Sequence, residues 1–195
     1  MEKRYIPLHD TQTRTDESGD LYINGYFAVF DSDYELWPGA TESIAPGAFD
    51  ESISGDVRAL YNHNDDIILG RTSAGTLKLE QTSRGLWGEI KINQKDSDAM
   101  NAYERILRGD ITGCSFGFDI EREEFRENPD GSYHWTILSV NPLYEVSPCV
   151  FPAYTETSVQ ARKKDVEKLQ QRRTEAWKKK MKERINHGPE STDDQ

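Results

Sequence analysis

Three side chains in this sequence carry the chemistry of acyl transfer by a hydroxyl nucleophile. Ser115 lies in the segment TGCSFGF (residues 112–118), His63 in LYNHND (residues 60–65) and Glu145 in LYEVS (residues 143–147). A serine nucleophile needs a base within hydrogen-bond reach, a group that orients this base, and donors for the oxyanion. The three segments offer these groups together, so the sequence predicts a hydrolytic site.

Ser115 is the candidate nucleophile because of the glycines around it. In a regular strand Gly113 and Gly117 share the face of the Ser115 side chain, so they clear space around its hydroxyl. Backbone N–H groups beside these glycines can point at an oxyanion, whereas Phe116 and Phe118 point the other way, into a core. The alternative interpretation is a strand serine whose glycines only relieve crowding.

His63 is the candidate general base. It follows a short, buried strand predicted over residues 57–61 and begins a polar loop, which places it at the rim of a sheet rather than on the buried face of a helix. The alternative is a single histidine with a structural role only.

Asp119, His134 and Glu145 compete for the role of the group that orients the base. A hairpin about the turn NPDG (residues 128–131) would place Ser115 opposite Tyr144 and beside Glu145. At about 3.3 Å per residue, His134 then lies on the order of 30 Å from Ser115 along the sheet, and Asp119 about 13 Å away. Glu145 is therefore favoured on geometry.

Two alternatives remain for Glu145. A bulge at Asn141–Pro142 would turn its side chain to the other face of the sheet. A buried carboxylate without partners is also costly, and the structural partners that compete with His63 are Arg105 and Arg108.

Short strands and turns dominate residues 1–160. Alternating apolar and polar residues predict one hairpin over 75–81 and 86–93, and a second over 113–126 and 132–140. The other expected elements are a strand over 21–30 with a bulge or close approach at Gly25, a loop over 36–49, a short helix over 49–54, a helix over 97–108 capped by Asp96 or Ser97, and a strand over 143–150 after a break at Pro142. Many strands with few helices predict a mainly β fold, a small closed β-barrel surrounded by a few helices.

A charged tail follows this domain. Residues 161–187 are predicted to form one basic helix, and residues 188–195 a disordered acidic end. Eleven Lys and Arg against four Asp and Glu give residues 162–184 a net charge of +7, whereas residues 1–160 carry −15. The favoured interpretation of the helix is a solvated charged surface. Docking to an acidic scaffold face or to another subunit is the alternative, and a nucleic-acid-binding arm is a weaker one.

Composition excludes several classes of protein. Of the 195 residues, 35% are hydrophobic and 30% charged, and no apolar run is long enough to cross a bilayer. The first residues lack the apolar core of a secretory signal, so an intracellular setting is expected. Cys114 and Cys149 form no framework, and the four histidines lie outside any ligand-spaced motif, so we expect neither a metal nor a cofactor. The net charge of −11 makes nucleic acid an improbable partner.

Five segments in order resemble the prohead serine proteases of tailed phages, which are distantly similar to herpesvirus assemblin. They are GYFAVF (residues 25–30), ESIAPGAF (42–49), LYNHN (60–64), GCSFGF (113–118) and LYEVS (143–147), the last followed by Pro152-Ala153. The resemblance covers about residues 5–160. It implies His63 as the catalytic histidine, Ser115 as the nucleophile and Glu145 as the matching carboxylate, with backbone groups at Gly113, Phe116 and Gly117, helped by Arg105 or Arg108, at the oxyanion.

The resemblance also implies what the chain acts on. The expected substrates are the scaffold, or a scaffold-like segment of the major capsid protein, and the protease itself, inside the immature shell in the host cytoplasm. A homo-oligomer, with a dimer as one option, and the portal are further candidate partners. No membrane is expected.

Two rival functions differ in class from a serine protease. One is a non-catalytic capsid-assembly protein that retains a protease-like barrel, which would be expected to have lost Ser115 or His63. The other is a cysteine hydrolase that uses Cys114 or Cys149. Ser147 is an alternative nucleophile within the serine protease hypothesis, although it lacks the flanking glycines.

Overall fold

The structure is a computed structural model, and it describes residues 2–6, 11–150 and 156–186. For residues 2–6, 156–159, 161 and 184–186 it describes the backbone only. The chain divides into a unit of residues 1–155 and a unit of residues 156–195. The first unit contains every residue of the predicted site.

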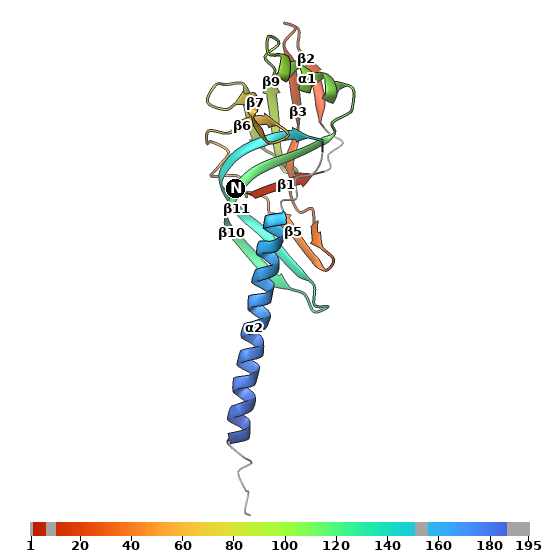
Figure 1. Ribbon diagram of the computed structural model, residues 1–195. Helices are drawn as coiled ribbons and strands as arrows, with labels where there is room; N and C mark the ends of the chain where they lie inside the picture. The colour runs from red at the N-terminus through yellow and green to blue at the C-terminus, as the bar shows by residue number, and fades with distance from the viewer. Residues whose placement is uncertain (1, 7–10, 151–155, 187–195) are drawn as a thin grey trace, which may run out of the picture. The chain divides into compact units, whose positions relative to one another are not determined.

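A long antiparallel hairpin lies at the centre of the larger sheet of the first unit (Figure 1). Its strands are β10 (Gly113–Glu127) and β11 (Tyr133–Cys149). At the tip, the Asn128 N–H donates to the Ser132 carbonyl at 2.8 Å, and Gly131 adopts a φ of 83°, which glycine reaches without steric cost. The predicted hairpin about residues 128–131 is thus confirmed.

Further strands join this hairpin into a seven-stranded sheet in the order β1-β10-β11-β5-β4, with β6 paired to β11 and to β7. β5 and β6 run parallel to β11, at its two ends. The added strands are β1 (Glu2–Ile6), β4 (Tyr34–Trp37), β5 (Ala40–Ile44), β6 (Arg58–Tyr61) and β7 (Asn64–Arg71).

A second, four-stranded antiparallel sheet has the order β2-β3-β9-β8. Its strands are β2 (Gln12–Thr15), β3 (Leu21–Val29), β8 (Leu77–Gln81) and β9 (Gly85–Lys91). β8 and β9 form the predicted hairpin about residues 83–85. The irregularity expected at Gly25 occurs instead between Tyr26 and Ala28. The Phe27 ring lies against Gly88, where an added Cβ would approach the ring to 2.7 Å.

The first unit also contains the helix α1 (Ser97–Leu107), which packs against the core of this unit. The Asp96 side chain accepts hydrogen bonds from the N–H groups of Asp98 and Ala99, which confirms the predicted N-terminal cap. The core is shared by the two sheets and this helix. At its centre the Phe116 ring lies 4.7 Å from that of Phe118 and 5.6 Å from that of Phe49.

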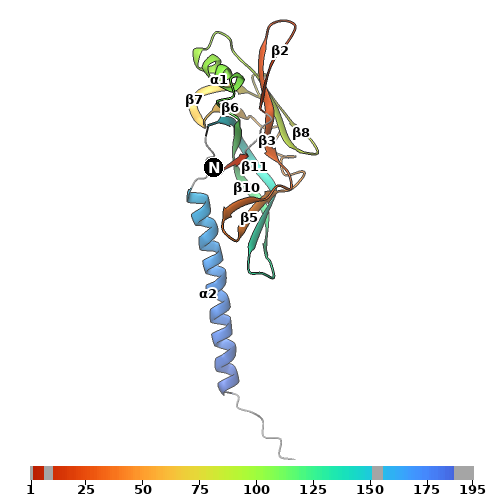
Figure 2. The same ribbon diagram turned by 90° about the vertical axis from the view of Figure 1, so that its right-hand side faces the viewer.

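The mainly β fold with few helices is confirmed, but the expected closed barrel is wrong. The strands form two separate open sheets (Figure 2). β1, β4 and, on the branch through β6, β7 end the larger sheet, and β2 and β8 end the smaller one. A closed barrel has no edge strands, whereas each of these five strands pairs with one neighbouring strand within the described sheets.

Three local expectations also fail. The loop expected over 36–49 contains the β4–β5 hairpin, whose strands flank Pro38-Gly39. Residues 49–54 form consecutive turns instead of a helix, since a segment this short gains too few hydrogen bonds to nucleate one. Strand β11 continues through Pro142, which follows a cis peptide bond, because the β10 ladder skips Asn141 and Pro142 and no N–H is required there.

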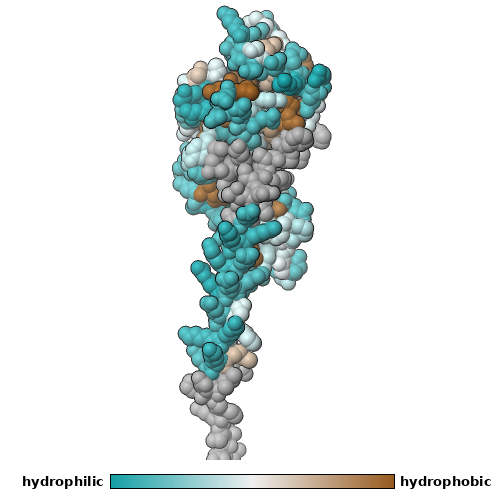
Figure 3. Space-filling model, viewed as in Figure 1, coloured by the Kyte–Doolittle hydropathy of each residue, from teal (hydrophilic) through white to brown (hydrophobic). Residues whose placement is uncertain are grey.

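The second unit consists of helix α2 (Glu156–Asn186). The face of this helix seen in Figure 3 is mostly hydrophilic. Trp177, with 60% of its surface exposed, and Met181, with 37%, are exposed apolar residues on it. Neither helix is long and apolar enough to cross a membrane, within the parts of the chain that the structure describes. The predicted acidic end, residues 188–195, and Pro152-Ala153 lie outside the described residues.

Candidate active site

A two-residue turn holds His63 at the end of β6. Tyr61 pairs with Asn64, so Asn62 and His63 are the central residues of the β6–β7 hairpin, with φ of 54° and 59°. Positive φ at both positions is the requirement of the turn that suits a two-residue hairpin. Left-handed backbone costs a non-glycine residue about 1–2 kcal/mol, so other contacts must hold His63 in this conformation.

Those contacts come from the end of β11. The Asn62 N–H donates to the Pro148 carbonyl at 3.0 Å, and the Asn62 side-chain oxygen accepts from the Val150 N–H at 2.9 Å. The His63 N–H donates to the Ser147 hydroxyl at 3.3 Å. Parallel pairing of β6 with β11 brings the two segments together, and three hydrogen bonds then fix the strained turn to β11.

The His63 ring is bonded to a buried carboxylate. Its Nδ1 lies 2.7 Å from Glu145 Oε1, and the two side chains are only 6% and 4% exposed. An ionised carboxylate can only accept, so this geometry requires the proton on Nδ1 and leaves Nε2 as the acceptor. The Nε2 atom is buried and has no hydrogen-bond partner among the described residues. A histidine in this tautomer is able to accept a proton from a hydroxyl.

Ser147 completes the environment of the carboxylate. Its hydroxyl donates to Glu145 Oε2 at 2.5 Å while accepting from the His63 N–H. Both oxygens of the buried Glu145 therefore have partners, as a desolvated charge requires. Because its proton is held by Glu145, Ser147 is poorly suited to the alternative role of nucleophile.

Ser115 lies on the neighbouring strand, directly opposite Ser147. Opposed residues share one face of an antiparallel pair, with Cβ atoms about 4.5–5.5 Å apart. Gly117 is paired with Glu145 on the same face, so it leaves room beside the carboxylate. Strand β11 lies between β6 and β10, and the His63 turn bonds to it at the level of Ser115.

The predicted register was three residues out. Ser115 was expected opposite Tyr144 and lies opposite Ser147. One residue of the difference is already present at the tip, where Glu127 pairs with Tyr133, and the irregularities between Gly117 and Glu123 add the other two. Glu145 nevertheless shares the face of Ser115, since its pairing partner Gly117 is two residues further along β10.

Other predicted site residues lie around or away from this cluster. Phe116 is fully buried in the core, on the face opposite Ser115. The Arg105 guanidinium lies 5.8 Å from the ring centre of Tyr61, two residues before His63. Arg108 instead bonds to Asp110 and is 75% exposed in its side chain, so its nearest partner is not in the site.

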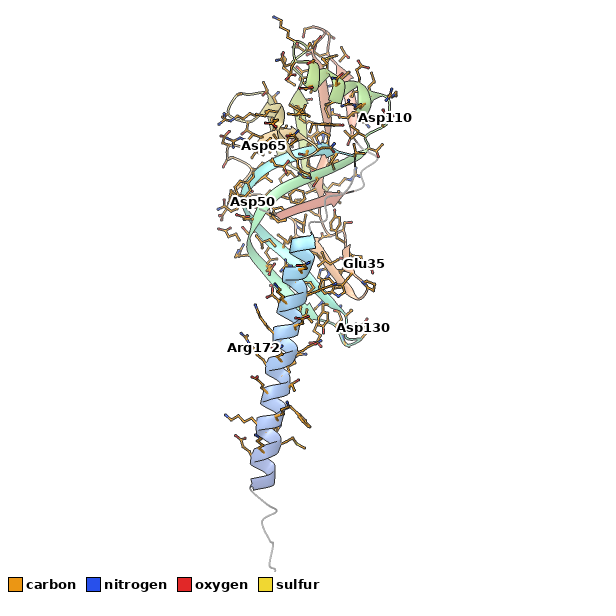
Figure 4. All side chains as sticks on the ribbon, viewed as in Figure 1. Glu35, Asp50, Asp65, Asp110, Asp130 and Arg172 are labelled. Atoms are coloured by element: carbon orange, nitrogen blue, oxygen red, sulfur yellow. The ribbon has the colours of Figure 1, made fainter. Side chains whose placement is uncertain are left out.

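The rejected carboxylate and histidine have partners of their own. Tyr144 donates to Asp119 at 2.6 Å. Both ring nitrogens of His134 are used, Nδ1 by Thr41 at 2.7 Å and Nε2 by Ser43 at 2.9 Å. Figure 4 marks Asp65, which follows the His63 turn in the sequence, and Asp130, at the tip of the hairpin, in separate parts of the molecule.

The two cysteines are poor nucleophiles. Cys114 and Cys149 are buried, and burial raises the pKa of each thiol to about 12. The thiolate is the reactive form, which argues against the cysteine hydrolase hypothesis. The described residues contain no cluster of three or more metal-binding side chains.

Sequence reasoning missed the supporting roles of Asn62 and Ser147. Asn62 and Asn64 flank the histidine as turn-forming residues do, and Ser147 follows Glu145 by two positions, on the same face of a strand. These signals could have suggested a tight turn and a carboxylate partner.

A histidine that is bonded to a buried carboxylate, beside a strand that carries a serine between glycines, defines a site suited to hydroxyl-nucleophile chemistry. Comparison with known proteins gives the same class. The family described as caudovirus prohead serine protease matches residues 9–172, and the chain belongs to this family.

Two individual proteins are similar to the chain. The prohead protease of Enterobacteria phage HK97 is 25% identical over 148 residues, which are 72% of this chain and 60% of the phage protein. The chain thus spans less than two thirds of that relative. A solved structure, the capsid assembly protease of bacteriophage T4, covers 78% of this chain and 100% of its own, with 13% identity and a TM-score of 0.40.

Proposed function

We propose that this chain is a serine endopeptidase of phage capsid maturation, with Ser115 as nucleophile, His63 as general base and Glu145 as the residue that orients the base. The observation that carries the proposal is the buried His63–Glu145 pair, whose acceptor atom Nε2 has no partner among the described residues. Family membership supports the same chemistry.

The mechanism follows from these positions. His63 Nε2 takes the proton of Ser115 as its oxygen attacks the scissile carbonyl, and then gives this proton to the leaving amine. Glu145 holds the ring in the required tautomer and stabilises the imidazolium that forms. Water then attacks the acyl-enzyme while His63 Nε2 takes its proton, and His63 returns this proton to the Ser115 oxygen as the acyl group leaves as a carboxylic acid. Backbone N–H groups near Gly113 and Gly117 are the proposed oxyanion donors, with Arg105 as a nearby cation.

The proposed substrates are the scaffold, or a scaffold-like segment of the major capsid protein, and the chain itself, inside the assembling procapsid in the host cytoplasm. Membership of the prohead serine protease family and the similarity to a phage prohead protease support this assignment. The protease domain over 1–160 and the basic helical tail are proposed as separate parts. Homo-oligomerisation and an interaction with the portal stay predictions.

Co-expression with the cognate major capsid protein tests the function. A shortened capsid band should appear with the wild type and disappear with Ser115→Ala and with His63→Ala. Ser139→Ala is a matched control, because Ser139 is a buried serine like Ser115 but lies on the partner strand β11 and donates to Glu121, away from the site. Full-length capsid protein in all samples, with every variant folded, would favour the non-catalytic assembly role.

Labelling the purified protein identifies the nucleophile. A fluorophosphonate should attach to Ser115, and an intact-mass comparison with Ser115→Ala should show self-cleavage only in the wild type. Attachment to Ser147 would contradict the assignment of the nucleophile, and an unchanged mass in both proteins would contradict self-processing.

A further inference from the structure

Strand β1 lies along the outer edge of the strand that carries the proposed nucleophile (Figure 1). Five consecutive residues of β1 pair antiparallel with residues Cys114 to Phe118 of β10, without irregularity. Tyr5 stands directly opposite Ser115. β10 is thus bordered by β11 on one side and by β1 on the other.

This pairing closes the one edge of β10 at which a polypeptide could be aligned with Ser115. An exposed strand edge offers alternate N–H and C=O groups to an extended segment, which then adds as a further strand. With β1 in place these groups of residues 114–118 are already paired, so they are available neither to a substrate backbone nor to an oxyanion. Ser115 is also fully buried, at 0% exposure.

Acyl transfer needs the opposite condition. The scissile carbonyl carbon must come within about 3–3.5 Å of the attacking oxygen. Some segment bordering Ser115 therefore has to leave before a polypeptide can react. β11 pairs with β10, β5 and β6, whereas β1 pairs with β10 alone within the described sheet. The strand with the fewest bonds to lose is β1.

We propose that the outer edge of β10 is the binding site for an extended substrate segment, and that β1 occupies it as an internal competitor that must be displaced. The inference rests on the proposed proteolytic function. Recognition at this edge is through the backbone, so the incoming segment runs antiparallel to β10 and takes the place of residues 2–6, with one residue opposite Ser115. Its side chains matter only at the alternate positions that face the site.

A single cysteine tests whether β1 can be locked in place. Ile6 is paired with Cys114, and directly opposed residues of antiparallel strands have Cα atoms about 4.5–5.5 Å apart, within the range that a disulfide spans. The variant Ile6→Cys should therefore form an intramolecular disulfide with Cys114 on mild oxidation. The loss of two hydrogen atoms lowers the intact mass by about 2 Da, which mass spectrometry detects. The control is Ile6→Cys combined with Cys114→Ser, which has no partner thiol at this position.

Cleavage of purified cognate capsid protein is the readout. Oxidised Ile6→Cys should cleave at least about tenfold more slowly than the same protein after reduction, because apparent affinity falls in proportion to the fraction of molecules with an open edge, and the cross-link should lower this fraction at least about tenfold. The control double variant should cleave at the same rate under both conditions. Failure of the disulfide to form, or equal rates from cross-linked and reduced protein, would overturn the proposal.

Opening the edge should have the opposite effect. Deletion of residues 2–6 should raise the cleavage rate, and so should Arg4→Pro, because proline cannot donate to the ladder. Arg4→Ala, which keeps the backbone donor, should behave as the wild type. If the deletion variant neither cleaves capsid protein nor takes a fluorophosphonate at Ser115, the proposed function itself fails. If it does both, while the cross-link has no effect, only the role of β1 fails.

Discussion

The substitution Glu145→Gln separates the charge of the orienting residue from its shape. Glutamine fills the same volume at this 3% exposed position and can still bond to His63 and Ser147. The variant lacks the negative charge that stabilises the imidazolium. Because this cation forms only as Ser115 loses its proton, the loss should appear in kcat rather than in substrate binding.

The size of the effect follows from the geometry. The bonded atoms, His63 Nδ1 and Glu145 Oε1, are 2.7 Å apart, and the centres of the two charges lie about 4 Å apart. At an effective dielectric constant of about 20, this separation corresponds to about 4 kcal/mol. Each 1.36 kcal/mol changes a rate about tenfold. The expected fall in kcat is therefore roughly a thousandfold.

Single-turnover cleavage of capsid protein and the rate of fluorophosphonate labelling measure this fall. Glu42→Gln is the matched control, since Glu42 is equally buried, at 1% exposure, but lies on β5. Thermal melts confirm that both variants are folded. A folded Glu145→Gln protein with kcat within tenfold of the wild type would refute the assignment of Glu145, and an equal loss in Glu42→Gln would attribute the effect to buried charge in general.

Three further predictions concern the surroundings of the site. Ser147→Ala removes a hydrogen bond to a charged group, worth about 1.5–3 kcal/mol, together with the acceptor of the His63 N–H; we expect a lower melting temperature and at least about tenfold slower cleavage, with partial recovery in Ser147→Thr. Asn62→Ala should lower the free energy of unfolding in urea by about 1–2 kcal/mol, whereas Asn62→Gly should lower it less, because glycine adopts the positive φ without strain. Native Cys114 and Cys149 should resist iodoacetamide at pH 8 and react only after denaturation, as followed by mass. Their pKa is raised in the folded chain, from 9.0 to about 12, so the stability that the protonated thiols contribute is fully present below pH 9 and is lost as the pH rises towards 12.

The sequence was sufficient for the elements whose signals are local. The hairpin turn at residues 128–131, the second hairpin about residues 83–85 and the capped helix after Asp96 depend on residues close in the chain. The β4–β5 hairpin was missed although Pro38-Gly39 is a strong turn signal, because its strands have only four and five residues and gain their stability from pairing with β11.

The residues at the site also divide into those with a local sequence signal and those whose role depends on distant segments. Ser115 and His63 were predicted from their neighbours and from the family resemblance, and Glu145 from an approximate hairpin register. The roles of Ser147 and Asn62 depend on the parallel pairing of β6 with β11, between residues more than 80 positions apart. No local pattern specifies which distant segments pair in parallel, so these hydrogen bonds could be found only in the structure. That the strands form two open sheets instead of a closed barrel could not be predicted for the same reason.

The irregularities of the β10–β11 ladder have a consequence for how this protein tolerates insertions and deletions. All four lie between Gly117 and Glu123, on the stretch that separates Ser115 from the tip of the hairpin. A single residue gained or lost there slides one strand past the other and turns Ser147 and Glu145 away from the serine. Changes of length at the tip that add equally to both strands leave this alignment intact. Spacing within these seven residues, more than their chemical identity, therefore keeps the two halves of the site together.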